Sequence, residues 1–326
     1  MASSVGAANR RRDTPITAVL PDLPALAYGC WRLADDSPTP DLVRRRITTA
    51  LDSGLTLIDT ADIYGHGTPA GFGGAEALLG ALLASDPALR GSMVLATKGG
   101  IVPGVPYDQS ATYLRSACEA SLDRLGADVI DLYFVHRPDV LTAPAELAGT
   151  LDALVDDGLV RAIGLSNFDA AHTRAVAAHL RHPLAALQPQ WSLAHLDPLW
   201  DGTHALACEL GAAVLAWSPL AGGALASLVN ARQDADAAPD RSADGLGTGE
   251  SVPDLATELV RLAHAHEVSA STVAMAWLCA LPGPVIPIVG SGHLGRIAEA
   301  ARAPELQLDS ADWYRLLEAA QGTPLP

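Results

Sequence analysis

The chain has 326 residues, of which 49% are hydrophobic and 18% are charged, and its formal net charge is −16 at pH 7. This length suits two average domains or one large α/β barrel, and so strong a negative charge argues against a nucleic-acid partner or an anionic membrane face. Apolar runs are broken well before the ~18 residues that a membrane-spanning helix needs, so no membrane contact is expected.

We expect the first 22 residues to form a separate tail or a short hairpin. They are small and polar, then basic at Arg10–Arg12. A twin-arginine export signal would continue into an apolar stretch, but Asp13 and Pro15 follow instead. The sequence therefore predicts a cytoplasmic protein, with export as the alternative.

From residue 23 onward, short apolar segments alternate with amphipathic ones. The segments expected to be strands are Ala25–Gly29, Leu55–Asp59, Met93–Lys98, Ile130–His136, Ala162–Ser166, Ala186–Gln190, Ala213–Trp217 and Val285–Val289. The segments expected to be helices include Asp41–Asp52, Ala75–Leu83, Ala111–Arg124, Pro144–Val155, Ala170–Leu180 and Asp254–His266. The strands lack polar alternation, which is typical of a parallel sheet covered on both faces.

Eight such repeats predict an α/β fold of the (β/α)8 TIM-barrel type, forming one domain over residues 23–326. A doubly wound sheet is the alternative. Residues 231–252 interrupt the pattern with an acidic, Ala- and Gly-rich segment after the seventh strand, which we expect to be a mobile loop.

Lysine and cysteine are both unusual in this chain. Lys98 is the only lysine, and it ends an apolar strand, where a solubilising surface lysine is not expected. The cysteines are too far apart for a Cys-x-x-Cys motif, so we expect buried, reduced thiols and no metal site; they are Cys30, Cys118, Cys208 and Cys279.

Four chemically active side chains follow successive strands. Asp59 ends the second predicted strand and Tyr64 follows it, Lys98 ends the third, and His136 ends the fourth. The carboxyl ends of barrel strands meet at one rim, so these side chains should lie together. An ammonium lowers the pKa of a nearby phenol, a carboxylate would keep that ammonium charged, and a histidine would orient a carbonyl. The set predicts a proton donor facing a carbonyl oxygen, and reduction then requires a nicotinamide cofactor as hydride source.

The set resembles the catalytic tetrad of the aldo-keto reductases. Gly164–Phe168, Trp217–Leu220 and Pro287–Gly292 resemble the fifth-, seventh- and eighth-strand segments of that family. The resemblance extends from about residue 23 to the C-terminus. It is strongest to the bacterial oxidoreductases related to potassium-channel β subunits.

The resemblance implies a role for each matching residue. Tyr64 would be the general acid, tuned by Lys98 and Asp59, and the substrate would contact His136, Trp31 and Ile63. The implied cofactor-binding residues are Gly29, Ser166, Asn167, Gln188, Trp217, Ser218, Pro219, Leu220, Gly222, Gly290, Ser291, Gly292, Arg296 and Glu299. Ser291 and Arg296 would bind an adenosine 2′-phosphate, which favours NADPH, with NADH as the alternative.

The chain also departs from the family pattern. Gly292 stands where some members have an arginine for this phosphate, and Ala300 stands where many have an asparagine. The loop His66–Gly74 is longer than the resemblance leads us to expect, and it borders the substrate site. The substrates of relatives therefore do not predict the substrate of this chain.

The function implied is reversible NADPH-dependent reduction of small aldehydes or ketones to alcohols. The alternatives are an NAD-dependent sugar or alcohol dehydrogenase on the same scaffold, a non-catalytic NADP-binding regulatory subunit, and a Schiff-base aldolase that uses Lys98. The sequence leaves a homo-oligomer open.

Overall fold

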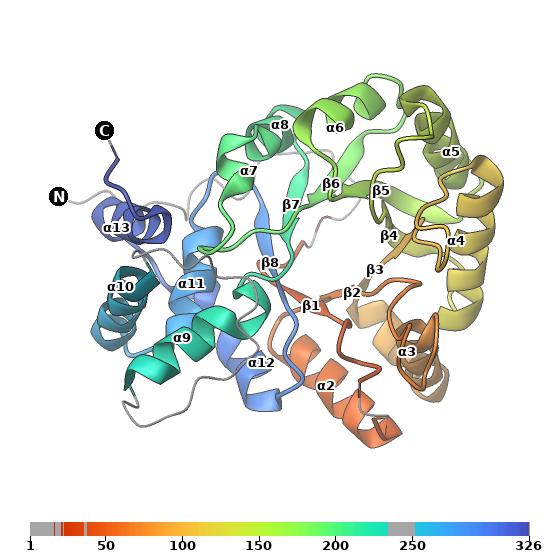
Figure 1. Ribbon diagram of the computed structural model, residues 1–326. Coiled ribbons are helices and arrows are strands. Elements are labelled where there is room, and N and C mark those ends of the chain that lie inside the picture. Colours follow the sequence, from red (N-terminus) through yellow and green to blue (C-terminus); the bar gives the residue numbers. More distant parts are fainter. Residues whose placement is uncertain (1–15, 17–20, 22, 36–37, 234–251, 326) are drawn as a thin grey trace.

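The computed structural model describes residues 16, 21, 23–35, 38–233 and 252–325. Eight parallel strands close into a barrel in sequence order, with β1 pairing to both β2 and β8 (Figure 1). The strands are β1 Ala27–Gly29, β2 Leu57–Asp59, β3 Val94–Gly99, β4 Ile130–Val135, β5 Val160–Ser166, β6 Leu184–Gln188, β7 Ala213–Ala216 and β8 Val285–Val289. The predicted (β/α)8 barrel is therefore confirmed.

The fifth and sixth strands differ in extent from the prediction. β5 begins before Arg161, an exposed residue whose guanidinium lies 3.0 Å from the carboxylate of Asp131 on β4. Because this exposed polar side chain breaks the apolar pattern, the sequence did not indicate that the strand begins before it. β6 ends before Pro189, which has no N–H for a strand ladder, so Gln190 makes only an isolated bridge to Trp217.

Helices cover the outside of the barrel (Figure 1). They are α2 Pro40–Asp52, α3 Gly74–Ser85, α4 Ala111–Leu125, α5 Pro144–Asp156, α6 Ala170–Ala177, α7 Asp197–Trp200, α8 Thr203–Leu210, α9 Ala224–Gln233, α10 Val252–His266, α11 Ala270–Cys279, α12 Leu294–Ala300 and α13 Ser310–Gln321, with 3-10 turns η1 Pro87–Ser92, η2 Ala221–Gly223 and η3 Ala303–Glu305. Side-chain caps set several of their starts; the carboxylate of Asp169, for example, accepts the N–H of His172 and begins α6. No helix in the described ranges is long and apolar enough to cross a membrane.

The barrel interior is filled by small and branched side chains around one aromatic ring. Its members are Ile16, Ala27, Leu57, Ala96, Leu132, Phe134, Ala162, Ala185, Ala186, Ala213, Leu215, Ile286 and Ile288. Gly164 makes room for the Phe134 ring, because a Cβ at this position would collide with it.

Of the predicted tail, Ile16 is fully buried in the barrel interior. Most of residues 1–22, and residues 234–251 of the predicted loop, lie outside the described residues.

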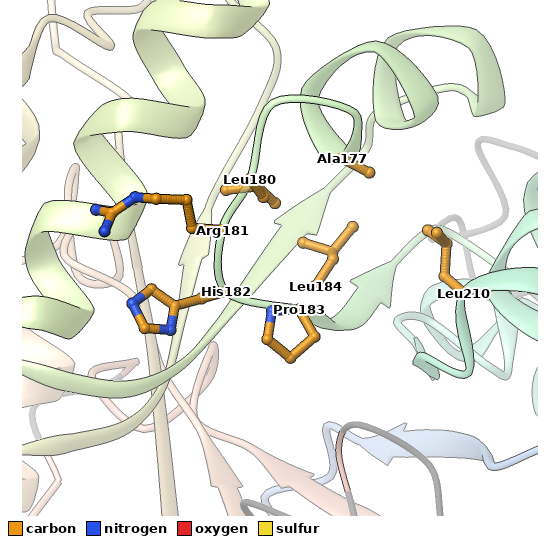
Figure 2. Close-up of a pocket in the computed structure, with 7 residues that line it drawn as sticks. All are labelled: Ala177, Leu180, Arg181, His182, Pro183, Leu184 and Leu210. Carbon is orange, nitrogen blue, oxygen red and sulfur yellow. The ribbon is translucent and has the colours of Figure 1, made fainter.

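A small cavity of about 220 Å³ lies at the end of the barrel where the strands begin. The ends of α6 and α8 and the start of β6 line it (Figure 2). Arg181 and His182 lie on the side of the cavity opposite Leu210, and their side chains point away from it (Figure 2). Both side chains bond to the carboxylate of Asp156 on α5. This cavity is at the opposite end of the strands from the rim that carries Asp59, Tyr64, Lys98 and His136.

Candidate active site

Lys98 is the centre of the site. Its side chain is fully buried at the end of β3, and its ammonium donates to Asp59 Oδ2 at 2.7 Å, the carbonyl oxygen of Thr60 at 2.8 Å and Tyr64 Oη at 3.0 Å. An ammonium has three N–H groups, so every one of them has a partner. The Tyr64 oxygen accepts from Lys98, and its own hydrogen is therefore directed to some other acceptor.

The segment after β2 holds Tyr64 beside this lysine. The backbone N–H of Asp62 donates to the carbonyl oxygen of Lys98 at 3.0 Å, and that of Ala75 donates to the carbonyl oxygen of Tyr64 at 3.1 Å. Gly65 follows with φ of 103° and leaves no room for a side chain against the next loop. A left-handed, tightly packed position of this kind favours glycine, so the turn gives the phenol a defined place.

Burial, rather than the lysine, decides the protonation of Tyr64. Burial raises the pKa of the phenol above its ordinary value, and the nearby ammonium of Lys98 lowers it only in part. Lys98 thus has the predicted lowering effect on the pKa of Tyr64, but burial outweighs it. The phenol stays neutral at pH 7 and retains the proton that a general acid must give.

Lys98 is held in its charged form. Burial lowers its pKa, but the carboxylate of Asp59 and the hydroxyl of Tyr64 more than offset this, and the net shift is upward. A Schiff-base lysine requires a neutral amine with a free lone pair. The geometry therefore opposes the aldolase alternative.

His136 completes the tetrad from the end of β4. Its ring is 9% exposed and lies edge-on to the Tyr64 ring, with the ring centroids 5.9 Å apart. Burial first, and then the charges of Lys98 and Arg137, hold the pKa of this histidine well below its usual value. A neutral imidazole results, which carries one N–H and is suited to hydrogen-bond a carbonyl oxygen.

Asn167 links the tetrad to the strand ends beyond it. It has an unusual φ of 61°, and its amide donates to the carbonyl oxygen of His136 at 3.0 Å and to Ser166 Oγ at 2.9 Å. The indole N–H of Trp217 donates to its amide oxygen at 2.9 Å. A non-glycine residue at positive φ stores strain that the surrounding contacts must hold, so these three bonds fix the amide in one orientation.

Gln188 on β6 binds the free oxygen of Asp59. Its amide donates to Asp59 Oδ1 at 2.9 Å, while Lys98 takes Oδ2. The backbone carbonyl oxygen of Gln188 accepts from Ser166 Oγ at 2.9 Å. The resemblance placed Gln188 at the cofactor and not at Asp59; nothing in the sequence signals this cross-barrel pairing.

The remaining predicted cofactor residues fall on adjacent strand ends. Ser218, Pro219, Leu220 and Gly222 follow β7, Gly290, Ser291 and Gly292 follow β8, and Arg296 and Glu299 lie on α12, outside the hydrogen-bonded tetrad. The β7 segment has positive φ at Ser218 and Gly222, and the position of Gly290 is open, with no atom near where a Cβ would lie. Backbone N–H groups in left-handed turns can form a concave binding site for an anion.

Two predicted substrate residues flank Tyr64. The Trp31 ring is 61% exposed and lies edge-on to the Tyr64 ring at a centroid distance of 5.0 Å. Ile63 is half-buried and packs on the core. Gly29, at the end of β1, is closely packed, since a Cβ there would lie 2.8 Å from Ile288 Cγ2.

A second buried group of acids behind the tetrad was not expected from the sequence. Glu76 is fully buried and accepts from Thr97 Oγ1 at 2.5 Å and from Arg124 Nε at 2.7 Å. Asp62 is also fully buried, and no side chain in the described ranges hydrogen-bonds to its carboxylate. Burial and the nearby charge of Glu76 raise the pKa of Asp62 to about 8, so this acid is mostly protonated at pH 7.

We expect Asp62→Asn to flatten the dependence of stability on pH. An unfolded aspartate releases its proton near pH ~4, whereas the folded protein retains it up to pH ~8, so the free energy of unfolding of the parent falls as pH rises between these values. At its steepest, Asp62 lowers the free energy of unfolding by about 1.4 kcal/mol for each pH unit. Urea unfolding at several pH values measures it. The exposed Asp52→Asn is the control, and equal slopes in the two variants would contradict the assignment.

The fold and the site together define an oxidoreductase-type barrel, with a buried Lys–Asp pair beside a tyrosine at the rim. The chain matches the aldo/keto reductase family over residues 25–321, and it belongs to that family.

Relatives and solved structures agree with this. The chain is 46% identical over 301 residues to the 6-dehydroglucose reductase of Novosphingobium aromaticivorans, covering 92% of this chain and 93% of that protein. It is 35% identical to the 6-dehydroglucose reductase of Agrobacterium fabrum, covering 92% and 95%. The glycerol dehydrogenase of Gluconobacter oxydans superposes with a TM-score of 0.77 at 28% identity, covering 93% of each chain. An aldo/keto reductase of Klebsiella pneumoniae, solved with NADP and acetate, shares the fold with a TM-score of 0.69 at 24% identity, also covering 93% of each chain.

Proposed function

We propose that this protein is an NADPH-dependent reductase of sugar aldehydes, with 6-dehydroglucose as the leading candidate substrate. The observation that carries the proposal is the 3.0 Å bond from Lys98 to Tyr64, in which the lysine has no donor left over and the phenol keeps its proton. The names of the relatives at 46% and 35% identity support the choice of substrate.

The rim fits a nicotinamide nucleotide. Asn167 would bind the carboxamide and Trp217 would stack on the ring, because the bond between them fixes both. Segments Ser218–Gly222 and Gly290–Gly292 would hold the phosphates, and their left-handed and open backbone positions support this. When bound, the cofactor supplies the hydride to the carbonyl carbon.

The side chains of the tetrad would transfer a proton to the substrate. Tyr64 gives its proton to the carbonyl oxygen as that oxygen gains negative charge, and the ammonium of Lys98 stabilises the phenolate that remains. Asp59 keeps Lys98 charged, and neutral His136 donates a hydrogen bond to the same carbonyl oxygen. The aldehyde thus gains one hydride and one proton and becomes a primary alcohol, and Tyr64 regains its proton from water.

Trp31 would contact the substrate rather than the cofactor. Its ring projects over Tyr64 and is largely exposed. A flat apolar ring of this kind offers a packing surface for the C–H face of a sugar while its N–H remains available to a hydroxyl.

A substrate panel tests the proposal. Loss of NADPH absorbance is followed with 6-dehydroglucose, other aldehydes and ketones, and the reverse reaction with alcohols and NADP or NAD. We expect the highest kcat/KM for 6-dehydroglucose with NADPH. Binding of NADPH without turnover of any carbonyl would favour the regulatory alternative, and a preference for NAD with alcohols would favour the dehydrogenase alternative.

A further inference from the structure

Three consecutive arginines on α2 have different partners. Arg44 is paired with Asp86 at 2.8 Å and Arg45 with Asp41 at 2.9 Å. Arg46 has no carboxylate partner among the described residues. Its Nε instead donates to the carbonyl oxygen of Gly292 at 3.0 Å. A half-buried guanidinium is thereby attached to the segment between β8 and α12.

The contact is possible because residue 292 is a glycine. A Cβ at this position would lie 2.8 Å from Arg46 Nη2 and 3.2 Å from its Cζ. The guanidinium therefore occupies the space that a side chain of residue 292 would take. A second bond, from Nη1 to the carbonyl oxygen of Arg32 at 3.3 Å, holds it from the other side.

The anchored guanidinium has donors to spare. Neither bond uses Nη2, for which the described part of the chain shows no hydrogen-bond acceptor. Arginine has five N–H donors in a planar fork, and an arginine that is already held in place loses little further freedom when it binds an anion. Arg46 is thus suited to bind a phosphate in front of Gly292.

Other groups of the same kind flank this position. Ser291 precedes Gly292, and Arg296 is exposed on α12 without a carboxylate partner in the described ranges. Helices α2 and α12 pack against each other, as Figure 1 shows at the edge of the barrel. Two arginines beside one short segment are a local positive site in a chain whose net charge is −16.

We propose that Arg46 binds the 2′-phosphate of the cofactor, in space that Gly292 leaves open for it. This inference rests on the proposed NADPH-dependent function and adds a binding residue from a helix early in the chain. The 2′-phosphate is the group that distinguishes NADPH from NADH, so Arg46 would act on the choice between the two cofactors.

Ligand affinity tests the proposal without turnover. Dissociation constants for NADPH, NADH, adenosine 2′,5′-bisphosphate and adenosine 5′-monophosphate are measured by calorimetry for the parent and Arg46→Met. We expect Arg46→Met to weaken NADPH and the bisphosphate roughly tenfold or more, as for loss of a hydrogen bond to a charged group. NADH and the monophosphate should change less than about twofold, because they lack the 2′-phosphate.

Two further variants complete the test, one as a matched control and one as a second probe of the contact between Arg46 and Gly292. Arg45→Met removes a neighbouring exposed arginine of α2 and should leave all four affinities unchanged. Gly292→Ala should displace the end of the flexible Arg46 side chain and weaken NADPH selectively, by a smaller factor. Thermal unfolding confirms that each variant is folded.

The outcomes separate this inference from the proposed function. Equal weakening of NADPH and NADH in Arg46→Met, or no change in either, would overturn the role of Arg46. If the parent bound neither dinucleotide, the proposed function would fail as well. If the parent bound and oxidised NADPH normally while Arg46→Met kept the parental selectivity, only the present inference would fail.

Discussion

Tyr64→Phe is expected to lower kcat for carbonyl reduction by roughly 10²–10⁴-fold, the usual contribution of a positioned general acid. Phenylalanine keeps the ring that packs against Trp31 and His136 but has no proton to give. The dissociation constant for NADPH should stay within about twofold of the parent, since the hydroxyl bonds to Lys98 and its loss leaves the nucleotide cradle intact. Steady-state turnover and calorimetric NADPH binding measure the two quantities.

The matched control is Tyr113→Phe on α4. Among the described residues, the hydroxyl of Tyr113 donates only to the carbonyl oxygen of Ile101, at 3.5 Å, and not to the tetrad. This control should keep parental turnover. Parental turnover in Tyr64→Phe would refute the proton-donor role of Tyr64.

The second large effect is expected for Lys98→Met, in both stability and activity. Methionine fills much of the same space but leaves the buried carboxylate of Asp59 without its cation. Removing one partner of a buried pair typically destabilises by about 3–5 kcal/mol. Turnover should also be lost, because no cation remains to stabilise a phenolate on Tyr64. Urea unfolding and steady-state kinetics measure the two losses.

A double variant separates the two roles of Lys98. Asp59→Asn with Lys98→Met removes both charges, while the amide oxygen at position 59 can still accept from Gln188. We expect this double variant to recover most of the lost stability and none of the activity. Recovery of turnover would show that Lys98 acts only through stability, and parental stability in the single variant would contradict the importance of the pair.

The order of residues along the chain was sufficient to predict the barrel and the grouping of four side chains at one rim, those of Asp59, Tyr64, Lys98 and His136. Strands buried on both faces have near-continuous apolar sequences, and their alternation with helices is visible without coordinates. Carboxyl ends of parallel strands share one rim, so Asp59, Lys98 and His136 could be placed together from their positions at strand ends alone. The single lysine of the chain pointed to the same rim.

Other properties depended on distances and burial, which one-dimensional spacing does not contain. The direction of the Tyr64 pKa shift follows from how completely the phenol is desolvated. The charge on Lys98 follows from the carboxylate of Asp59 and the hydroxyl of Tyr64 beside it. The Gln188–Asp59 bond spans the barrel, and Arg46 meets Gly292 across 246 positions of sequence. Residues so distant along the chain become neighbours when the sheet closes and the helices pack on it. Their contacts are consequences of tertiary packing and leave no periodic signal in the sequence.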